Sequence, residues 1–346
     1  MDCNRGTLHG MKRMNPVLLA ALLCVILRPG FAAENYAVPR TQWNQPDLQG
    51  VWNFSSEVPM QRPEHFGDRE FLTPTEIAAQ SQPIQLIGRR QPIRSANGVE
   101  AFYNDNIWAE NRSREEVART SLIVYPANGR LPSLQPGVLY QPGGERDVAG
   151  QRPVRFTVGG IGRDGPEDRG LSERCLVGFN TGPQFTPGVY NNNVRIVQNR
   201  DHVVILTEMV HDARVVRLGN KPALHEDIGL WSGDSRGYWE GDSLVVVTKN
   251  FNGLTQSFES YGSSREKVLT ERFTRRGPDS MDYQFTIEDP ATFTDRITVL
   301  LPITRVPTEL YEYACHEGNY GMGNMLRASR VREATAESDR VANLFR

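Results

Sequence analysis

The clearest strand signal in the chain is Met281-Asp-Tyr-Gln-Phe-Thr-Ile-Glu288. Apolar and polar side chains alternate along it, which is the period of a β-strand with one packed face and one polar face. Further β-rich runs follow one another through the second half of the chain, separated by hairpin-sized gaps. They cover residues 194–198, 202–209, 213–218, 238–239, 244–250, 268–275, 297–304 and 310–314. Eight or nine strands without crossover helices predict an antiparallel meander.

A meander of this length leaves two sheet edges exposed, and closure into a barrel removes both. We therefore expect a mainly β protein whose meander closes into a lipocalin- or calycin-like barrel over residues 171–330. Residues 33–170 are expected to form an irregular N-terminal wrap with early strands and a short helix capped by Thr73. Residues 331–346 are expected to be a C-terminal tail. A barrel of about eight strands has room for one small ligand.

The N-terminus has the three parts of a secretory signal peptide. Lys12 and Arg13 supply positive charge, residues 17–27 form an unbroken apolar run, and Gly30-Phe-Ala32 places small residues before a cleavage site. The apolar run is too short to span a bilayer. We expect residues 1–32 to be removed, which leaves a periplasmic or secreted protein without membrane attachment. The alternative is a hydrophobic core element at the N-terminus.

The cysteine count predicts a disulfide. The chain has four cysteines, and removal of the signal peptide would remove Cys3 and Cys24. The remaining pair, Cys175 and Cys315, would reside in an oxidising compartment, so we predict a bond between them. Two buried thiols are the alternative.

The charge of the chain argues against nucleic-acid binding. The 346 residues carry 39 Lys and Arg against 41 Asp and Glu, a formal net charge of −2. Without residues 1–32, four basic residues and one acidic residue are lost, which leaves 35 basic against 40 acidic residues. Such a surface offers no broad attraction to phosphates. The sequence also lacks HExxH, CxxC and phosphate-loop motifs, so no metal, cofactor or nucleotide is expected.

The chain resembles a broad family of exported, mostly uncharacterised bacterial proteins. The resemblance covers most of the expected mature chain, and its motifs occur in order. They are Pro46-Asp-Leu-Gln-Gly-Val-Trp52, Arg119-Thr-Ser-Leu-Ile-Val124, Tyr190-Asn-Asn-Asn193, Glu208-Met-Val-His-Asp-Ala-Arg214, Gly233-Asp-Ser-Arg-Gly-Tyr-Trp-Glu-Gly-Asp242 and Tyr311-Glu-Tyr-Ala-Cys-His-Glu-Gly-Asn-Tyr320. The resemblance implies export and a lipocalin-like barrel. It implies no particular reaction, so the chemistry has to be inferred from the residues.

The densest ionisable group in the β-rich region is the segment from Glu208 to Arg214. On a regular strand, Glu208, Asp212 and Arg214 share one face, and His211 points to the other. A bulge before His211 would bring it to the side of Glu208, where burial would tune both groups for acid–base catalysis. Asp212 would orient His211 or pair with Arg214, whose guanidinium also suits a substrate carboxylate. A structural salt-bridge network at the barrel rim is the alternative.

A second group of candidates surrounds the predicted disulfide. His316 and Glu317 directly follow it, and Tyr311 and Tyr313 precede it on one face of a predicted strand. Together they would line the wall opposite His211, with His316 as a further catalytic group. The alternative is a chain end held by the disulfide, with His316 bound to a backbone carbonyl.

Three further side chains are candidates for substrate binding, namely Tyr190, Asn192 and Trp239. The amides that follow Tyr190 orient a substrate or stabilise a tight turn, and the preceding Pro187 and Gly188 favour the turn. Trp239 precedes a predicted hairpin turn and is expected to pack in the core.

These patterns favour an enzyme that acts on a hydrophobic or aromatic small molecule inside the barrel. Cofactor-free acid–base chemistry of an isomerase, cyclase or lyase would suit the residues best, and hydrolysis is a less favoured reaction. The alternative is a non-catalytic carrier or sensor of an apolar ligand. A third hypothesis is a structural protein whose barrel is filled by side chains.

Overall fold

The alternating stretch lies in strand β9 (Ser280–Glu288). Its side chains alternate between buried and partly exposed positions, as the pattern predicts. Tyr283 and Phe285 are fully buried and belong to the hydrophobic core. The core therefore lies on the inner face of a sheet whose other face is polar.

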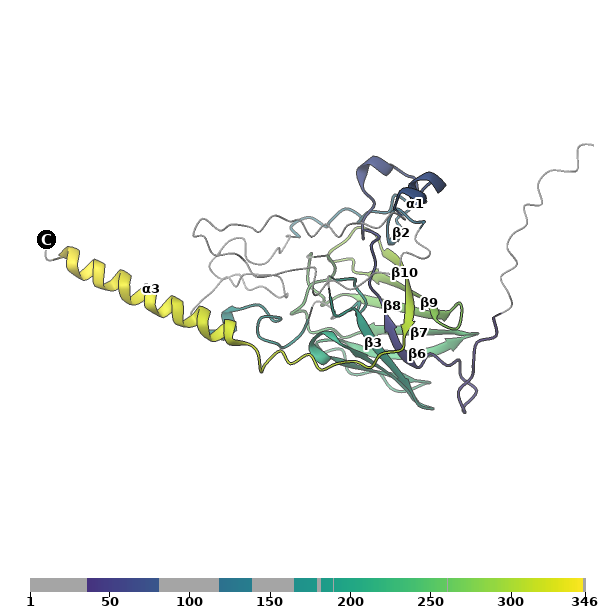
Figure 1. Cartoon of the computed structure of the whole chain (residues 1–346). Coiled ribbons are helices and arrows are strands. Elements are labelled where there is room, and N and C mark those ends of the chain that lie inside the picture. The colour runs from purple at the N-terminus through teal and green to yellow at the C-terminus, as the bar shows by residue number, and fades with distance from the viewer. Residues whose placement is uncertain are drawn as a thin grey trace, which may run out of the picture. The chain divides into compact units, whose positions relative to one another are not determined.

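The computed structural model describes residues 36–80, 118–138, 165–178, 182–188, 190–259 and 261–344. The predicted signal peptide, residues 1–32, lies outside the described residues. Contacts group Val38–Arg346 into one unit, which is the part described below and drawn in Figure 1. Its other strands are β1 (Gly50–Asn53), β2 (Ile123–Tyr125), β3 (Asn193–Gln198), β4 (His202–Thr207), β5 (Ala213–Leu218), β6 (Asp234–Glu240), β7 (Ser243–Lys249), β8 (Val268–Arg275) and β10 (Ile297–Val306).

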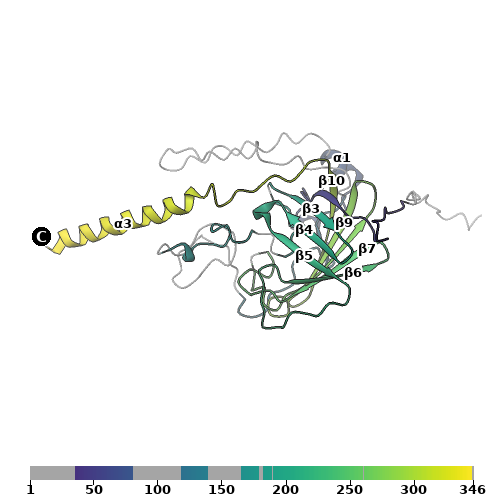
Figure 2. The ribbon, with the colours of Figure 1, turned by 90° about the horizontal axis from the view of Figure 1, so that it is seen from below.

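The described strands form a closed barrel, which confirms the predicted mainly β, calycin-like fold. Nine of them follow the order β1-β3-β4-β5-β6-β7-β8-β9-β10, and β1 pairs with β10 to close the ring. Strand β2 adds to the free part of the β10 edge. Figure 2 shows β3, β4 and β5 side by side in this ring. Strand β1 comes from the segment that the sequence predicts as an irregular wrap, so that segment completes the barrel.

One neighbouring pair departs from the predicted antiparallel meander. Strands β5 and β6 are parallel, with Arg217 opposite Arg236 and Leu218 opposite Gly237. Gly237 is required at this contact, because a Cβ atom there would lie 2.8 Å from Val216 Cγ1. A parallel pair needs a connection that returns along the barrel, and the residues between β5 and β6 supply it.

The chain that precedes β1 is held against the barrel by several contacts. Trp52 Nε1 donates to the carbonyl of Leu48 at 2.9 Å, and Arg275 Nη1 donates to the carbonyl of Asp47 at 3.0 Å. The Arg275 guanidinium also lies 5.6 Å from the centroid of the Trp52 ring. On β3, the Gln198 amide accepts from the backbone N–H of Leu48 at 2.6 Å. These contacts attach the segment before β1 to the barrel.

The helices lie at the start and the end of the described chain. Helix α1 (Pro74–Gln80) is the predicted short helix. Thr73 Oγ1 accepts from the backbone N–H of Glu76 at 3.3 Å, and the Glu76 carboxylate accepts from the N–H of Thr73 at 2.7 Å, which is a capping box. Three short 3₁₀ turns are η2 (Glu64–Phe66), η3 (Pro166–Asp168) and η4 (Met209–His211).

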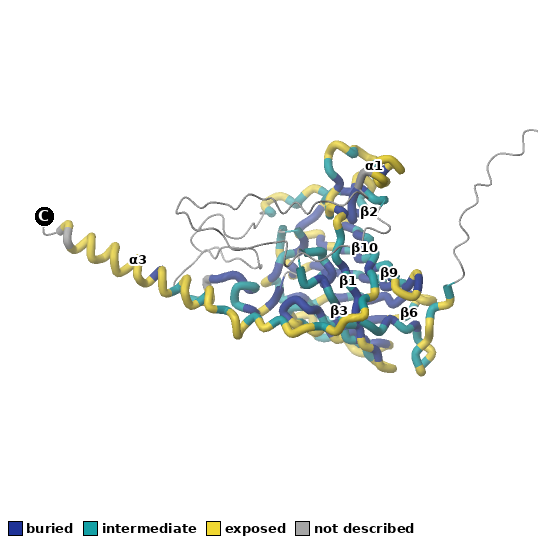
Figure 3. The backbone as a smooth tube through the Cα atoms, in the orientation of Figure 1, coloured by how far each residue is buried: buried dark blue, intermediate teal, exposed yellow. Residues whose placement is uncertain are grey.

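The C-terminal part differs from the prediction. Strand β10 is the last strand, and residues 310–314 form no strand. They are followed by helix α3 (Tyr320–Leu344), whose side chains are mostly exposed (Figure 3). The barrel therefore ends well before residue 330. Within the described residues, neither α-helix combines the length and apolar character that a membrane span needs.

Candidate functional site

The segment from Glu208 to His211 is a tight turn between β4 and β5 rather than a bulged strand. Val210 and His211 both have positive φ angles, 58° and 43°, which is rare for residues other than glycine. Glu208 is buried, and its carboxylate accepts from Asn193 Nδ2 at 2.8 Å. The Asn193 side chain in turn accepts from Asn53 Nδ2 at 3.0 Å. The Glu208 carboxylate is thus tied to strands β1 and β3.

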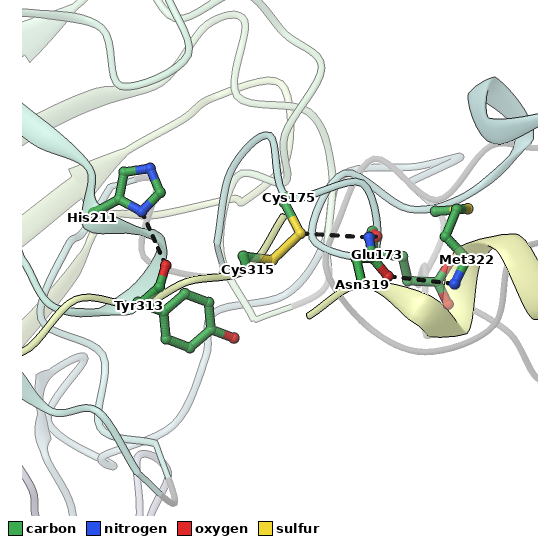
Figure 4. Close-up of a disulfide and its surroundings, with 7 residues drawn as sticks. All are labelled: Glu173, Cys175, His211, Tyr313, Cys315, Asn319 and Met322. Carbon is green, nitrogen blue, oxygen red and sulfur yellow. Dashed lines mark hydrogen bonds between the residues drawn. A yellow bond between two sulfur atoms is a disulfide. The ribbon is translucent and has the colours of Figure 1, made fainter. Parts of the chain in front are cut away.

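His211 has a different environment from Glu208. Its side chain is exposed, and Nδ1 lies 3.2 Å from the carbonyl oxygen of Tyr313. Figure 4 shows this contact beside the disulfide. The structure therefore brings the turn and the segment before Cys315 together, as the sequence predicts, but at an exposed position. Their separate partners and unequal burial do not favour Glu208 and His211 as a buried acid–base pair.

The predicted disulfide is confirmed. The Cys175 and Cys315 sulfurs are bonded, and their Cα atoms lie 5.7 Å apart (Figure 4). Asn319 Nδ2 donates to the carbonyl of Glu173 at 2.8 Å and strengthens the same junction. The neighbouring candidates do not line the barrel interior, because they are exposed to solvent. They are Tyr311, His316 and Glu317.

The other predicted site residues take mainly structural positions. The buried Asn192 side chain exchanges two hydrogen bonds with the backbone of Gly188, so the turn hypothesis describes it. Tyr190, two residues earlier, is partly exposed. Trp239 is partly buried against the core, as expected. Asp212 accepts from Ser232 Oγ at 2.8 Å and does not form the expected pair with Arg214.

A Gly-x-Ser-x-Gly pattern at residues 233–237 is a feature that the sequence analysis overlooked. In hydrolases, this pattern places a nucleophilic serine on a sharp strand-to-helix turn. Here Ser235 lies within the extended strand β6 and is buried. Its hydroxyl shares a hydrogen bond of 2.8 Å with that of Thr248 on β7. The local structure therefore gives no support to a nucleophilic role for Ser235.

The barrel interior contains a buried ionic network that sequence reasoning missed. Arg214 from β5 pairs with Glu271 from β8 through two hydrogen bonds, at 2.5 and 2.9 Å. Tyr283 from β9 donates its hydroxyl to the same carboxylate at 2.7 Å. The two charged side chains are only 3% and 0% exposed. Glu271 lies between Leu269 and Phe273 on the inner face of β8, and this inward charged position was the signal in the sequence.

The protonation of this network follows from its burial. Desolvation lowers the pKa of Arg214, but the charge of Glu271 more than compensates and holds it above its usual value. Burial raises the pKa of Tyr283 well above 10, and the negative charge of Glu271 raises it further. Arg214 is therefore charged and Tyr283 keeps its proton. The positive and negative charges lie side by side, so the network contributes little net charge to the interior.

Aromatic rings surround this network. The Phe185 ring stacks on Phe54 with centroids 5.3 Å apart and lies 4.4 Å from the Tyr283 ring. The Phe273 ring lies 5.0 Å from the Tyr283 ring, and the Phe285 ring lies 5.6 Å from it. All five residues are essentially buried. The interior thus combines an aromatic wall with one convergent polar group.

A second buried cation lies at the start of β8. Lys267 Nζ donates to the carbonyls of Gly182, Ser257 and Gln256 at 2.7, 3.0 and 3.3 Å. It also lies 4.5 Å from the centroid of the Phe251 ring. Burial lowers the pKa of Lys267 to about 7, against the opposing charges of acidic residues nearby. Lys267 therefore connects the segments that meet at this end of the barrel.

No described group of three or more His, Cys, Asp or Glu residues is arranged to hold a metal ion. Comparison with known proteins adds no assignment, because no protein-family model and no curated protein matches the chain. The barrel interior is consequently the part of the described chain that bears on function.

Proposed function

We propose that the protein binds a small, largely apolar molecule inside the barrel. The observation that carries the proposal is the aromatic wall around the Arg214–Glu271–Tyr283 network. Ligand sites in proteins are mostly lined by apolar and aromatic side chains with a few convergent polar groups. Barrels of about this strand number are either filled by their own side chains or hold one small ligand.

Binding without catalysis agrees best with the contacts. Both carboxylate oxygens of Glu271 accept from Arg214, and one also accepts from Tyr283. A carboxylate with these partners is poorly placed to take a proton from a substrate, because both of its oxygens already accept hydrogen bonds within the network. The Glu208 carboxylate is similarly engaged by Asn193. We therefore favour a carrier or sensor, exported through the predicted signal peptide, over an acid–base enzyme.

The test is a fluorescence titration with N-phenyl-1-naphthylamine, an uncharged aromatic probe whose emission rises in apolar surroundings. We expect saturable binding of one probe per chain. Phe273→Leu should weaken binding about tenfold, because it removes one ring of the aromatic wall. Tyr238→Leu is the matched control, since Tyr238 is an aromatic residue that is 48% exposed on β6. Absence of saturable binding, or equal effects of both substitutions, would contradict an interior site.

A further inference from the structure

One ring of the aromatic wall belongs to a loop and not to a strand. We call residues 182–188 the inner loop. Its Phe185 is fully buried and contacts Phe54, Phe273 and Tyr283, with ring centroids 5.3, 5.7 and 4.4 Å away. The loop thus places a single benzene ring against the polar network.

The inner loop is anchored at its two ends. At the first end, the carbonyl of Gly182 accepts from Lys267 Nζ at 2.7 Å. At the other end, the backbone of Gly188 exchanges hydrogen bonds of 2.6 and 3.1 Å with the Asn192 side chain. Between these anchors Pro183, Gln184 and Phe185 are buried, and Phe185 packs against the rings of the aromatic wall. The ends of the loop are thus held by hydrogen bonds to other segments, whereas its middle is held by packing.

The docked position of the inner loop carries a penalty. Gln184 is 0% exposed, and neither its amide nitrogen nor its amide oxygen has a hydrogen-bond partner within the described chain. Burial of unpaired polar groups costs free energy that is recovered when they reach water. Release of the loop would hydrate this amide, so the penalty lowers the cost of opening.

The surroundings of Phe185 also define what would replace it. Its ring lies between aromatic rings, and the ion pair beside it is neutral as a unit. A buried anionic or cationic group would lack a counter-charge there, because Arg214 and Glu271 already neutralise each other. An uncharged ring meets no such cost.

We propose that the ligand carries an uncharged aromatic ring that takes the place of the Phe185 side chain, and that the inner loop is a plug displaced by binding. This inference rests on the proposed function and specifies its ligand class and its gate. The plug competes with the ligand, so substitutions within the inner loop that weaken its docking increase affinity, and substitutions within the loop that strengthen its docking reduce it. Substitutions in the barrel wall, such as Phe273→Leu, act on the ligand and the plug alike and do not test the competition.

The test uses two loop variants with opposite expected effects. Phe185→Ala removes the competing ring and should tighten binding of N-phenyl-1-naphthylamine at least tenfold. Gln184→Leu removes the unpaired amide, stabilises the docked loop and should weaken binding about fivefold. The second variant is essential, since Phe185→Ala alone would also create an artificial cavity. Near-ultraviolet circular dichroism checks that each variant is folded. If Phe185→Ala does not fold, Phe185→Leu takes its place in the comparison with Gln184→Leu.

The charge requirement is tested with 8-anilino-1-naphthalenesulfonate, which adds a sulfonate to nearly the same ring system. We expect at least tenfold weaker binding of this anion by the wild-type protein. Equal affinity for both probes would overturn the uncharged ligand class. If Phe185→Ala does not bind the probe more tightly than the wild type, or if Gln184→Leu does not bind it more weakly, the plug is overturned and the proposed function is not. Absence of saturable binding by the wild-type protein would overturn the proposed function itself.

Discussion

Replacement of Glu271 by glutamine should destabilise the protein strongly. The substitution keeps the shape of the side chain but removes the charge that faces Arg214, whose side chain is only 3% exposed. Loss of one partner from a buried ion pair typically costs about 3–5 kcal/mol, because the other charge stays buried without compensation. The double substitution Arg214→Met with Glu271→Leu removes both charges and should return the free energy of unfolding to within about 2 kcal/mol of the wild type.

The assay is urea unfolding with the disulfide intact, followed by circular dichroism and linear extrapolation to water. Strand β8 offers a matched control, since Arg272 on its outer face pairs with Glu240 at 2.5 Å, and both side chains are more than a third exposed. Glu240→Gln should change stability by less than about 1 kcal/mol. If Glu271→Gln is as mild as Glu240→Gln, the network is solvated and the account of the interior is refuted.

Three other predictions concern separate parts of the molecule. Because burial lowers the pKa of Lys267 to about 7, the unfolded chain binds one more proton than the native state between about pH 7 and pH 10. Stability should therefore rise with pH across this range, and Lys267→Met should flatten the rise in urea midpoints; an unchanged slope would contradict the low pKa. Replacement of Cys175 and Cys315 by serine opens a loop that the disulfide closes across 140 positions. In the chain-entropy model this should lower the free energy of unfolding by about 5 kcal/mol. A decrease below about 1 kcal/mol in the same assay would contradict a stabilising disulfide. His211→Ala should leave the dissociation constant of N-phenyl-1-naphthylamine within twofold of wild type, because the imidazole is exposed; a tenfold loss would restore His211 to the binding site.

Much of the barrel could be predicted from the sequence because each strand carries its own signal. The period-two alternation of residues 281–288 identifies β9 without reference to any other segment. Closure followed from the need to cover two edges. Strand β1 has only four residues and lies far from the meander, so its part in closure depended on pairing that no local pattern contains. The parallel contact of β5 with β6 was hidden for the same reason.

The C-terminal helix shows the limits of local pattern in another way. Helix α3 is exposed over most of its length, so it lacks the apolar stripe by which a packed helix is recognised. Gly321 and Gly323 at its start also disfavour a helix. The preceding residues 310–314 looked like a strand because tyrosines alternate there, but the side chain of Tyr311 is 77% exposed.

The candidate site was predicted only in part. The cysteine pairing followed from counting, and the approach of the 208–214 segment to the residues before Cys315 followed from the predicted closure of the barrel. The exposed position of that contact was not predicted. The orientation of the turn before His211 could not be predicted, because Val210 adopts a positive φ that β-branched residues rarely take. The partner of Arg214 is 57 positions away, and its identity depends on the alignment of strands around the barrel.

A crystal structure of the protein with bound N-phenyl-1-naphthylamine would show whether a ligand replaces Phe185 inside the barrel. We expect one aromatic ring of the probe between Phe54, Phe273 and Tyr283, with the Phe185 side chain moved out of the barrel. A probe bound on the outer surface while Phe185 keeps its contact with Tyr283 would contradict this expectation.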